Sequence, residues 1–345
     1  MGLYRKYKPH MLLVVNQLCY TFLYFMTEAA FNLGMNPHVY VTYRALVAGI
    51  VMLPFAYFLE RDVRPKLTIT LFLEIFMLSL LGVSLSLNVH FDSLKYSSPT
   101  FLTAMTNTTP SLTFIFAVAL RLEVLNRRDP RSIAKVLGTM VSLGGVITMT
   151  TYKGPIIRNL WHPLIQIQRN SPVHENWLKA SLLTVSSCII WATYNIMQAL
   201  TLKRYHAELS LTVWMSFVGA AQSAIYTVIV AHKPSDWIIG FNIEFWSTIY
   251  SGVVTSGVVV FFQLWCTKQK GPVFITIFNP LCTVLVAMLA YFVFGEKLYL
   301  GRIIGAVIVI IGLYLLLWGK EGDNEVHNKA KKQSQCNCEH PESRI

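Results

Sequence analysis

The sequence is poor in charged side chains, which make up 13% of its 345 residues against about 25% in a soluble domain. Hydrophobic residues reach 54%, and the mean hydropathy of +0.49 indicates more apolar segments than one water-soluble core can bury. These values exclude an ordinary soluble enzyme and a disordered chain. A net charge of +12 is typical of nucleic-acid-binding proteins, but in an apolar chain it must first be compared with membrane topology.

Cysteines are few and do not form a disulfide framework. Four of the six lie in apolar stretches, where buried free thiols are expected: Cys19, Cys188, Cys266 and Cys282. Cys336 and Cys338 stand near His340 in a polar tail and offer too few ligands for a metal site. Phosphate-binding loops and nucleophile–base pairs are also missing from the sequence. It therefore predicts no enzyme activity, no cofactor and no metal.

Ten apolar segments approach the length of about 20 residues that crosses a bilayer core. The first five are 11–32, 38–59, 69–92, 98–120 and 133–152, and the second five are 177–200, 208–231, 244–266, 272–294 and 300–318. We therefore expect an all-α integral membrane protein with ten transmembrane helices. The expected divisions are a cytoplasmic N-terminus (1–10), a first five-helix unit (11–152), a non-cytoplasmic linker (153–176), a second five-helix unit (177–318) and a disordered cytoplasmic tail (319–345).

The distribution of Lys and Arg orients these segments. With the N-terminus in the cytoplasm, the inner connections hold 20 of these residues and the outer connections hold 8. Cytoplasmic loops of membrane proteins collect such positive charge. Both termini are therefore predicted to be cytoplasmic. The positive net charge is a topology signal, and nucleic acid is not expected as a partner.

An internal repeat relates the two sets of five segments. Residues 98–103 match residues 271–276 at an offset of 173, and the same offset carries Glu123 onto Glu296. Because five is odd, the second unit enters the membrane from the opposite side. Inverted repeats of this kind recur in secondary transporters, whose substrate site lies near the midplane between the halves. The alternative is a gene duplication that only produced a stable bundle.

Polar residues inside the spans are costly and mark cavities or helix contacts. Glu28 and Arg44 are expected at similar depths in the outer half, where an ion pair would join the first two spans. Gating or binding of a substrate carboxylate is the alternative for Arg44. His90, with Asn88, is predicted to guard the outer opening, although a hydrogen-bonded structural histidine is equally compatible. The repeat places Gln198 and Gln263 at the inner opening.

Two asparagines near prolines indicate the centre of the site. Asn107 precedes Pro110, and Asn279 directly precedes Pro280, in corresponding spans of the two units. A proline inside a helix removes one backbone hydrogen bond and disturbs the carbonyl four residues earlier. Interrupted helices in matching positions indicate a transporter site, with a simple packing kink as the alternative. The predicted substrate-binding residues are Asn107, Asn279, Asn88, Trp191, Gln198 and Gln263.

Several longer motifs resemble one plant family. They are Tyr43-Arg44, 54–60, 98–123, 152–155, 271–274, 300–306, 312–314 and 317–320. Together they resemble the "walls are thin"-related proteins, also called the usually-multiple-acids-move-in-and-out transporters, over roughly residues 8–320. Glu28 departs from the pattern, because relatives commonly carry Lys or Arg there.

The resemblance implies the drug/metabolite transporter fold with two EamA domains. It also implies movement of amino acids, or in some members auxin, across the plasma or vacuolar membrane, and we expect the plasma membrane. The expected partners are a small-molecule substrate and the lipid bilayer, with a homo-oligomer left open. We interpret the chain as an amino-acid transporter working by alternating access. The alternatives are a transporter of auxin or another indole-like acid, and a non-transporting receptor or scaffold.

Overall fold

The computed structural model describes residues 2–61, 68–121, 129–152, 154–157, 177–202, 205, 207–230, 234–259, 262, 266, 278–292 and 298–338. Its first half contains α1 (Gly2–Asn32), α2 (Pro37–Leu59), α3 (Ile69–Ser79), the π-helix η1 (Leu80–Leu85), α4 (Ser86–Leu94), α5 (Pro99–Thr106), α6 (Thr109–Ala119), α7 (Pro130–Thr151) and β1 (Ile156–Ile157). Its second half contains α8 (Trp177–Leu202), α9 (Glu208–Val230), the 3₁₀ turn η2 (Pro234–Trp237), α10 (Ile243–Tyr250), the π-helix η3 (Ser251–Val259), α13 (Asn279–Phe292), β2 (Leu298–Tyr299) and α14 (Leu300–Cys338).

Three helices begin with the same local chemistry, a polar cap followed by proline. The Asn36 side chain accepts a hydrogen bond from the His38 backbone N–H at 3.0 Å before α2. Ser98 caps α5 and Asp129 caps α7 in the same way, and proline follows each of them. The cap accepts a hydrogen bond from a backbone N–H that has no acceptor within the helix, and proline has no backbone N–H that would need one. These short motifs therefore fix where the helices enter the bundle.

The fourth apolar segment is broken at the place where the sequence predicts an interruption. α5 ends at Thr106 and α6 begins at Thr109, and the N–H groups of Asn107 and Thr108 bond three residues back instead of four. Pro110 lacks the N–H that would have continued the helix toward Thr106. The backbone at Asn107 is consequently irregular and sits in the middle of the bundle.

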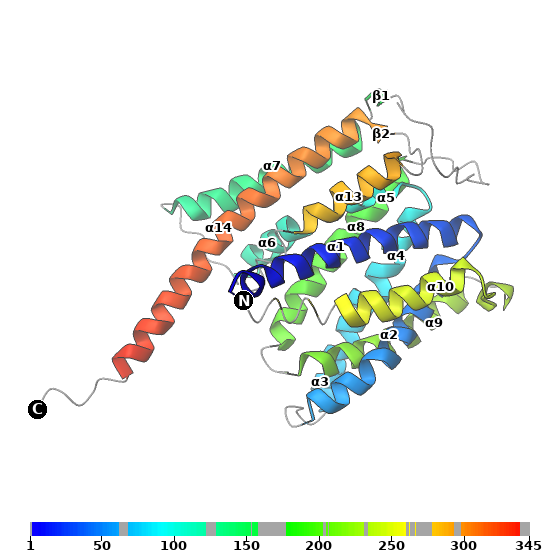
Figure 1. The fold of residues 1–345 in the computed structure, drawn as a ribbon, viewed down its shortest axis with the longest axis horizontal. Coiled ribbons are helices and arrows are strands. Elements are labelled where there is room, and N and C mark those ends of the chain that lie inside the picture. The colour runs from blue at the N-terminus through cyan, green and yellow to red at the C-terminus, as the bar shows by residue number, and fades with distance from the viewer. Residues whose placement is uncertain are drawn as a thin grey trace, which may run out of the picture.

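Helix packing is closest between helices of different halves. α7 lies along α14, and α2 lies along α9, while α1 contacts α10 and α13 (Figure 1). Glycines line the α7–α14 contact, where a Cβ on Gly145 would stand 2.7 Å from the backbone nitrogen of Val309. We call the contact formed by Gly138, Gly145, Gly305 and Gly312 the glycine seam. Small residues at such positions let two membrane helices approach closely.

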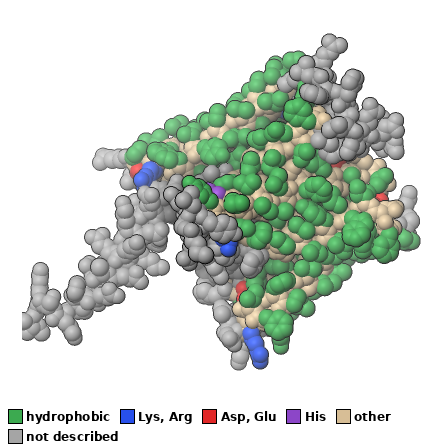
Figure 2. All heavy atoms as spheres, in the orientation of Figure 1, with side chains coloured by type: hydrophobic (Ala, Val, Ile, Leu, Met, Phe, Trp, Pro, Cys, Tyr) green, Lys and Arg blue, Asp and Glu red, His purple; other side chains and the backbone are tan. Residues whose placement is uncertain are grey.

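Within the described ranges, six helices are long and apolar enough to cross a membrane. They are Pro37–Leu59, Ile69–Leu94, Pro130–Thr151, Leu178–Gln198, Leu209–Val230 and Leu300–Gly319. Large hydrophobic side chains cover most of the outer face in Figure 2, and charged groups stand near its edges. The chain is therefore a helical membrane protein, to which β1 and β2 add one antiparallel pair of two-residue strands. The count of ten spans stays a prediction.

One boundary differs from the sequence prediction. The tail from residue 319 was expected to be disordered, but α14 continues through Cys338. Extending an existing helix needs no new nucleus, and no proline occurs before Pro341 to stop it. The tail is therefore helical for most of its length. The predicted linker lies largely outside the described residues.

Candidate functional site

A cavity of about 720 Å³ lies between the two halves of the chain. Both halves supply its walls: the first through α1, α2, α4, α5 and α6, and the second through α8, α13 and α14. Its volume falls within the range of about 300–1,000 Å³ that is usual for small-molecule sites. The cavity therefore has the size and position expected of a site shared between two halves.

Six of the residues selected from the sequence line this cavity. Asn107 and Asn279 come from the interrupted segments, and Trp191, Arg44, His90 and Pro110 complete the set. Four others, Glu28, Asn88, Gln198 and Pro280, are not among the described lining residues. Gln263 lies outside the described residues. The described wall of the cavity therefore contains six of the eleven residues selected from the sequence.

Asn107 lies at the junction of the two halves. Its side-chain NH₂ donates to Thr283 Oγ1 at 2.7 Å, and Thr283 Oγ1 donates to the Thr103 carbonyl at 3.2 Å. Asn107 is 5% exposed, so this hydrogen bond is made away from bulk solvent. Such a bond contributes more specificity than one at the surface, because an unpaired amide would be costly here. Asn107 therefore both lines the cavity and joins α5 to α13.

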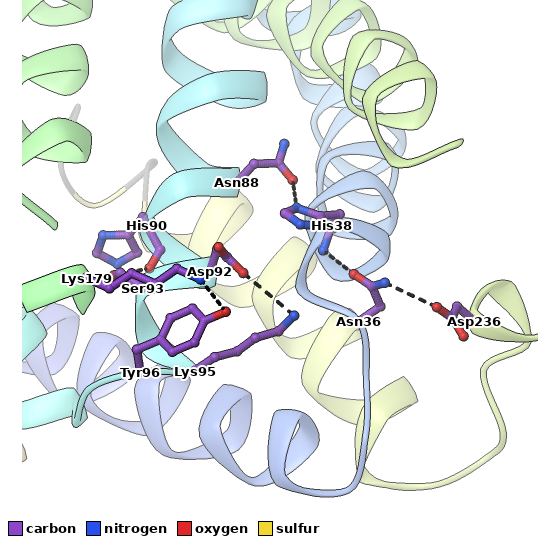
Figure 3. A network of polar contacts seen from close by, with 10 residues as sticks. All are labelled: Asn36, His38, Asn88, His90, Asp92, Ser93, Lys95, Tyr96, Lys179 and Asp236. Carbon is purple, nitrogen blue, oxygen red and sulfur yellow. Dashed lines mark hydrogen bonds and ion pairs between the residues drawn. The ribbon is translucent and has the colours of Figure 1, made fainter. Parts of the chain in front are cut away.

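Asn88 belongs to a different contact. Its Oδ1 lies 2.9 Å from His38 Nδ1, and its NH₂ donates to Ser223 Oγ at 2.8 Å and to the Ser84 carbonyl. Figure 3 shows Asn88 turned toward His38, while Asn36 lies between His38 and Asp236. Asn88 is only 2% exposed. The structure thus places this predicted substrate ligand in a buried network among α2, α4 and α9.

Aromatic rings and one cation line another part of the cavity. The Arg44 guanidinium carbon lies 5.4 Å from the centroid of the Phe91 ring. His90 is 5.3 Å from Phe91 and 6.2 Å from Tyr24, measured between ring centroids. Arg44 is half-buried and faces the cavity with these rings. Among the described residues Arg44 has no ion-pair partner, so the structure does not contain the predicted pairing of Arg44 with Glu28.

Several lining residues were missed. They are mostly small hydroxyl and amide groups: Gln17, Ser86, Thr103, Thr106, Thr109, Thr113, Ser187, Asn195 and Thr283. Two signals could have found some of them. Asn195 follows Trp191 by four residues and so shares its helix face. Residues 27–30 align with 197–200 at an offset of 170, and this offset carries Gln17 onto Ser187. Thr and Ser are common inside membrane helices, where they bond to their own backbone, so their presence alone was no signal.

The cavity wall carries groups that can bind a small polar solute. Within the described part of the chain there is no group of three or more His, Cys, Asp or Glu side chains that could hold a metal. Cys188 and Cys282 line the cavity as free thiols. The wall otherwise offers hydroxyls, amides, aromatic faces and one guanidinium. These groups can orient a small polar solute by hydrogen bonds.

Comparison with known proteins agrees with this architecture. The profile of the EamA-like transporter family matches residues 8–151 and 178–318. WAT1-related protein At2g39510 of Arabidopsis thaliana is 41% identical over 323 residues, covering 92% of this chain and 86% of that protein. WAT1-related protein At5g07050 of the same plant is 39% identical over 330 residues, covering 92% and 82%.

A protein of known crystal structure shares the fold, with a TM-score of 0.56 and 15% identity over 90% of this chain and 97% of that one. The resemblance found in the sequence motifs is confirmed by the relatives above. Together with the apolar helices, the family match establishes a multi-pass membrane protein of a transporter family. The chain belongs to the EamA-like transporter family.

Proposed function

We propose that the chain has ten spans arranged as two inverted five-helix repeats, with both termini in the cytoplasm. The pattern of helix contacts supports this proposal. Exchanging the halves turns the contacts of α3, η1 and α4 with α8 into the contacts of α10 and η3 with α1, and leaves the α2–α9 and α7–α14 contacts unchanged. The π-helices η1 and η3 also occupy matching places, with Gly82 and Gly252 related by an offset of 170.

The chain moves small organic solutes, and amino acids are the substrates we assign to it. The observation that carries this proposal is the cavity between the halves, whose centre is lined by neutral dipoles. The side chains of Asn107 and Asn279 can bond to a carboxylate or an ammonium without fixing a net charge in a low-dielectric site. A carrier needs such moderate binding, because the solute must also leave.

Alternating access at this cavity is the proposed mechanism, with the plasma membrane as its location. His90 stands beside Tyr24 in the cavity wall and is a candidate for the outer gate. Gln198 and Gln263 are the candidates for the inner gate. Because Asn88 lies in the buried network with His38, its part is to hold α2, α4 and α9 together at the outer side.

An indole-like acid such as auxin is the second candidate substrate. The aromatic wall formed by Tyr20, Tyr24, Phe91 and Trp191, together with the Arg44 cation, favours it. A receptor or scaffold without transport is the remaining alternative.

Uptake and efflux by purified protein in liposomes test the proposal. Radiolabelled amino acids and auxin should each be offered at graded concentrations, with protein-free liposomes as the control. We expect saturable flux of at least one amino acid. Saturable flux of auxin alone would select the second candidate. Binding without flux of any solute would favour the receptor.

A further inference from the structure

Arg44 is the one charged group in the described wall of the cavity. The other described lining residues include neutral amides, hydroxyls, thiols, aromatic rings and the ionisable His90, but no Asp or Glu. A guanidinium stays protonated at every physiological pH. In the absence of solute, the described wall therefore presents a fixed positive charge without an opposing carboxylate.

Contacts with the protein leave the donors of Arg44 available. Within the described residues the guanidinium has no hydrogen bond or ion pair, and its aromatic neighbour is the Phe91 ring at 5.4 Å. A cation–π contact holds the group in place but supplies no oxygen for its five N–H donors. Phe91 is itself fixed, because it is 2% exposed and packs edge-on against Tyr40 at 5.2 Å.

A solute carboxylate complements this arrangement. The planar guanidinium matches a carboxylate with two parallel hydrogen bonds, and the pair is strongest where water is excluded. Other aromatic rings of the cavity wall, Tyr24 and Trp191 among them, offer an apolar surface for the remainder of the solute. An amine or another cation would instead be repelled, because no described lining residue carries a negative charge.

We propose that Arg44 binds the carboxylate of the transported solute and thereby makes the cavity select carboxylate-bearing solutes over their amine and alcohol analogues. This inference rests on the proposed function and names the chemistry shared by its two candidate substrates. The bound monocarboxylate forms a neutral complex with Arg44. The bound amino acid places its ammonium group toward the amide oxygens at the centre of the cavity.

The test compares solutes that share an indole ring and differ at one group. Tryptophan and indole-3-acetate carry a carboxylate, whereas tryptamine and indole-3-ethanol do not. We expect the wild-type protein in liposomes to prefer the carboxylates. Arg44→Gln should raise the KM of the transported carboxylate about tenfold or more, the usual loss with one charge-assisted pair. The KM for indole-3-ethanol should change far less, so the preference is lost.

Three further variants separate this role from the alternatives. Arg44→Lys keeps the charge but cannot form the two-pronged pair, so its KM for the carboxylate should lie between those of wild type and Arg44→Gln. Lys95→Gln removes an exposed cation that pairs with Asp92 at 3.7 Å and should leave selectivity unchanged. Glu28→Gln should also keep the preference for carboxylates, because Arg44 binds the solute carboxylate in this proposal and does not pair with Glu28.

Retained preference for carboxylates in Arg44→Gln would overturn the inference. Equal loss of flux for carboxylate and alcohol would overturn it too, because a gate or structural bridge acts on every solute alike. If Arg44→Gln does not reach the membrane, a KM for Arg44→Lys equal to that of wild type would likewise contradict the inference. If wild-type protein moves no solute, the proposed function fails, and the inference is judged by binding. Indole-3-acetate or tryptophan should then raise the melting temperature of detergent-purified wild type but not of an Arg44 variant.

Discussion

Asn107 and Asn279 were predicted as a matched pair, but the structure gives them different surroundings. Asn107 donates to Thr283 across the halves, whereas the described residues provide no hydrogen-bond partner for the Asn279 side chain, which faces the cavity. A buried hydrogen bond contributes about 1 kcal/mol to stability, and an unsatisfied partner costs more. The two residues should therefore differ in stability effects while sharing a role in binding.

We expect Asn107→Ala to raise the KM for substrate and to lower the melting temperature by a few degrees. Asn279→Ala should raise the KM with little change in melting temperature. Thr283→Val should reproduce the stability loss, and combining it with Asn107→Ala should add little, because both remove the same bond. Transport by liposomes and thermal melts in detergent provide the measurements. If both Asn variants reach the membrane and transport with unchanged concentration dependence, the midplane site is wrong.

Among the elements, α7 and α14 form the closest helix pair, because glycines let their backbones meet. A Cβ on Gly145 would stand 2.8 Å from the Gly305 carbonyl oxygen, closer than two such atoms can approach. Gly144, the preceding residue on the same helix, has no atom within 4 Å of that position. The chain thus offers a matched pair of neighbouring glycines, one inside the contact and one outside it.

Gly145→Ala should lower the melting temperature clearly, since the helices must move apart to accept the methyl group. Gly144→Ala should be neutral or slightly stabilising, because alanine favours a helix over glycine by about 1 kcal/mol. The readout is the melting temperature of both purified variants in the same detergent. Equal melting temperatures of the two variants would show that α7 and α14 are farther apart at the glycine seam than the structure places them.

α14 supports a second prediction at this scale. It still contacts α7 at Gly319, where a Cβ would lie 2.7 Å from the Arg131 carbonyl oxygen. Deleting residues 325–345 removes only the part of the helix beyond that contact. Transport per molecule should therefore be unchanged, although trafficking can differ. Flux of the truncated protein in liposomes is the measurement, and its loss from well-folded protein would contradict the prediction.

Elements were predictable where a local signal fixes them. Asn36-Pro37, Ser98-Pro99 and Asp129-Pro130 mark helix starts, and Pro110 marks the break after Asn107. The π-helices were not predictable, because a π-helical turn has no characteristic amino-acid pattern and depends on how the neighbouring helices pack. Asn107 and Asn279, selected from the sequence, both line the cavity, but the burial of Asn88 could not be predicted. Its network depends on His38 and Ser223, which lie far away in the sequence.

At the scale of the whole molecule, most of the strong contacts join one half to the other. α2 packs on α9, α7 packs on α14, and Asn107 reaches Thr283 at the cavity. A charge or volume change in one half is therefore transmitted to the other through direct contact. Direct contacts along two helix pairs and at the cavity therefore join the two halves of the chain.

The glycine seam has a consequence for how the protein can be assembled. Surfaces that fit this closely recognise each other without help from a continuous backbone, so the chain can be cut between Ile157 and Trp177. Two co-expressed fragments, 1–165 and 166–345, should form a heterodimer that transports, whereas each fragment alone should be inactive. Gly145→Leu in the first fragment should prevent the two fragments from associating. Transport by the paired wild-type fragments would show that the intact protein behaves as two subunits joined in one chain.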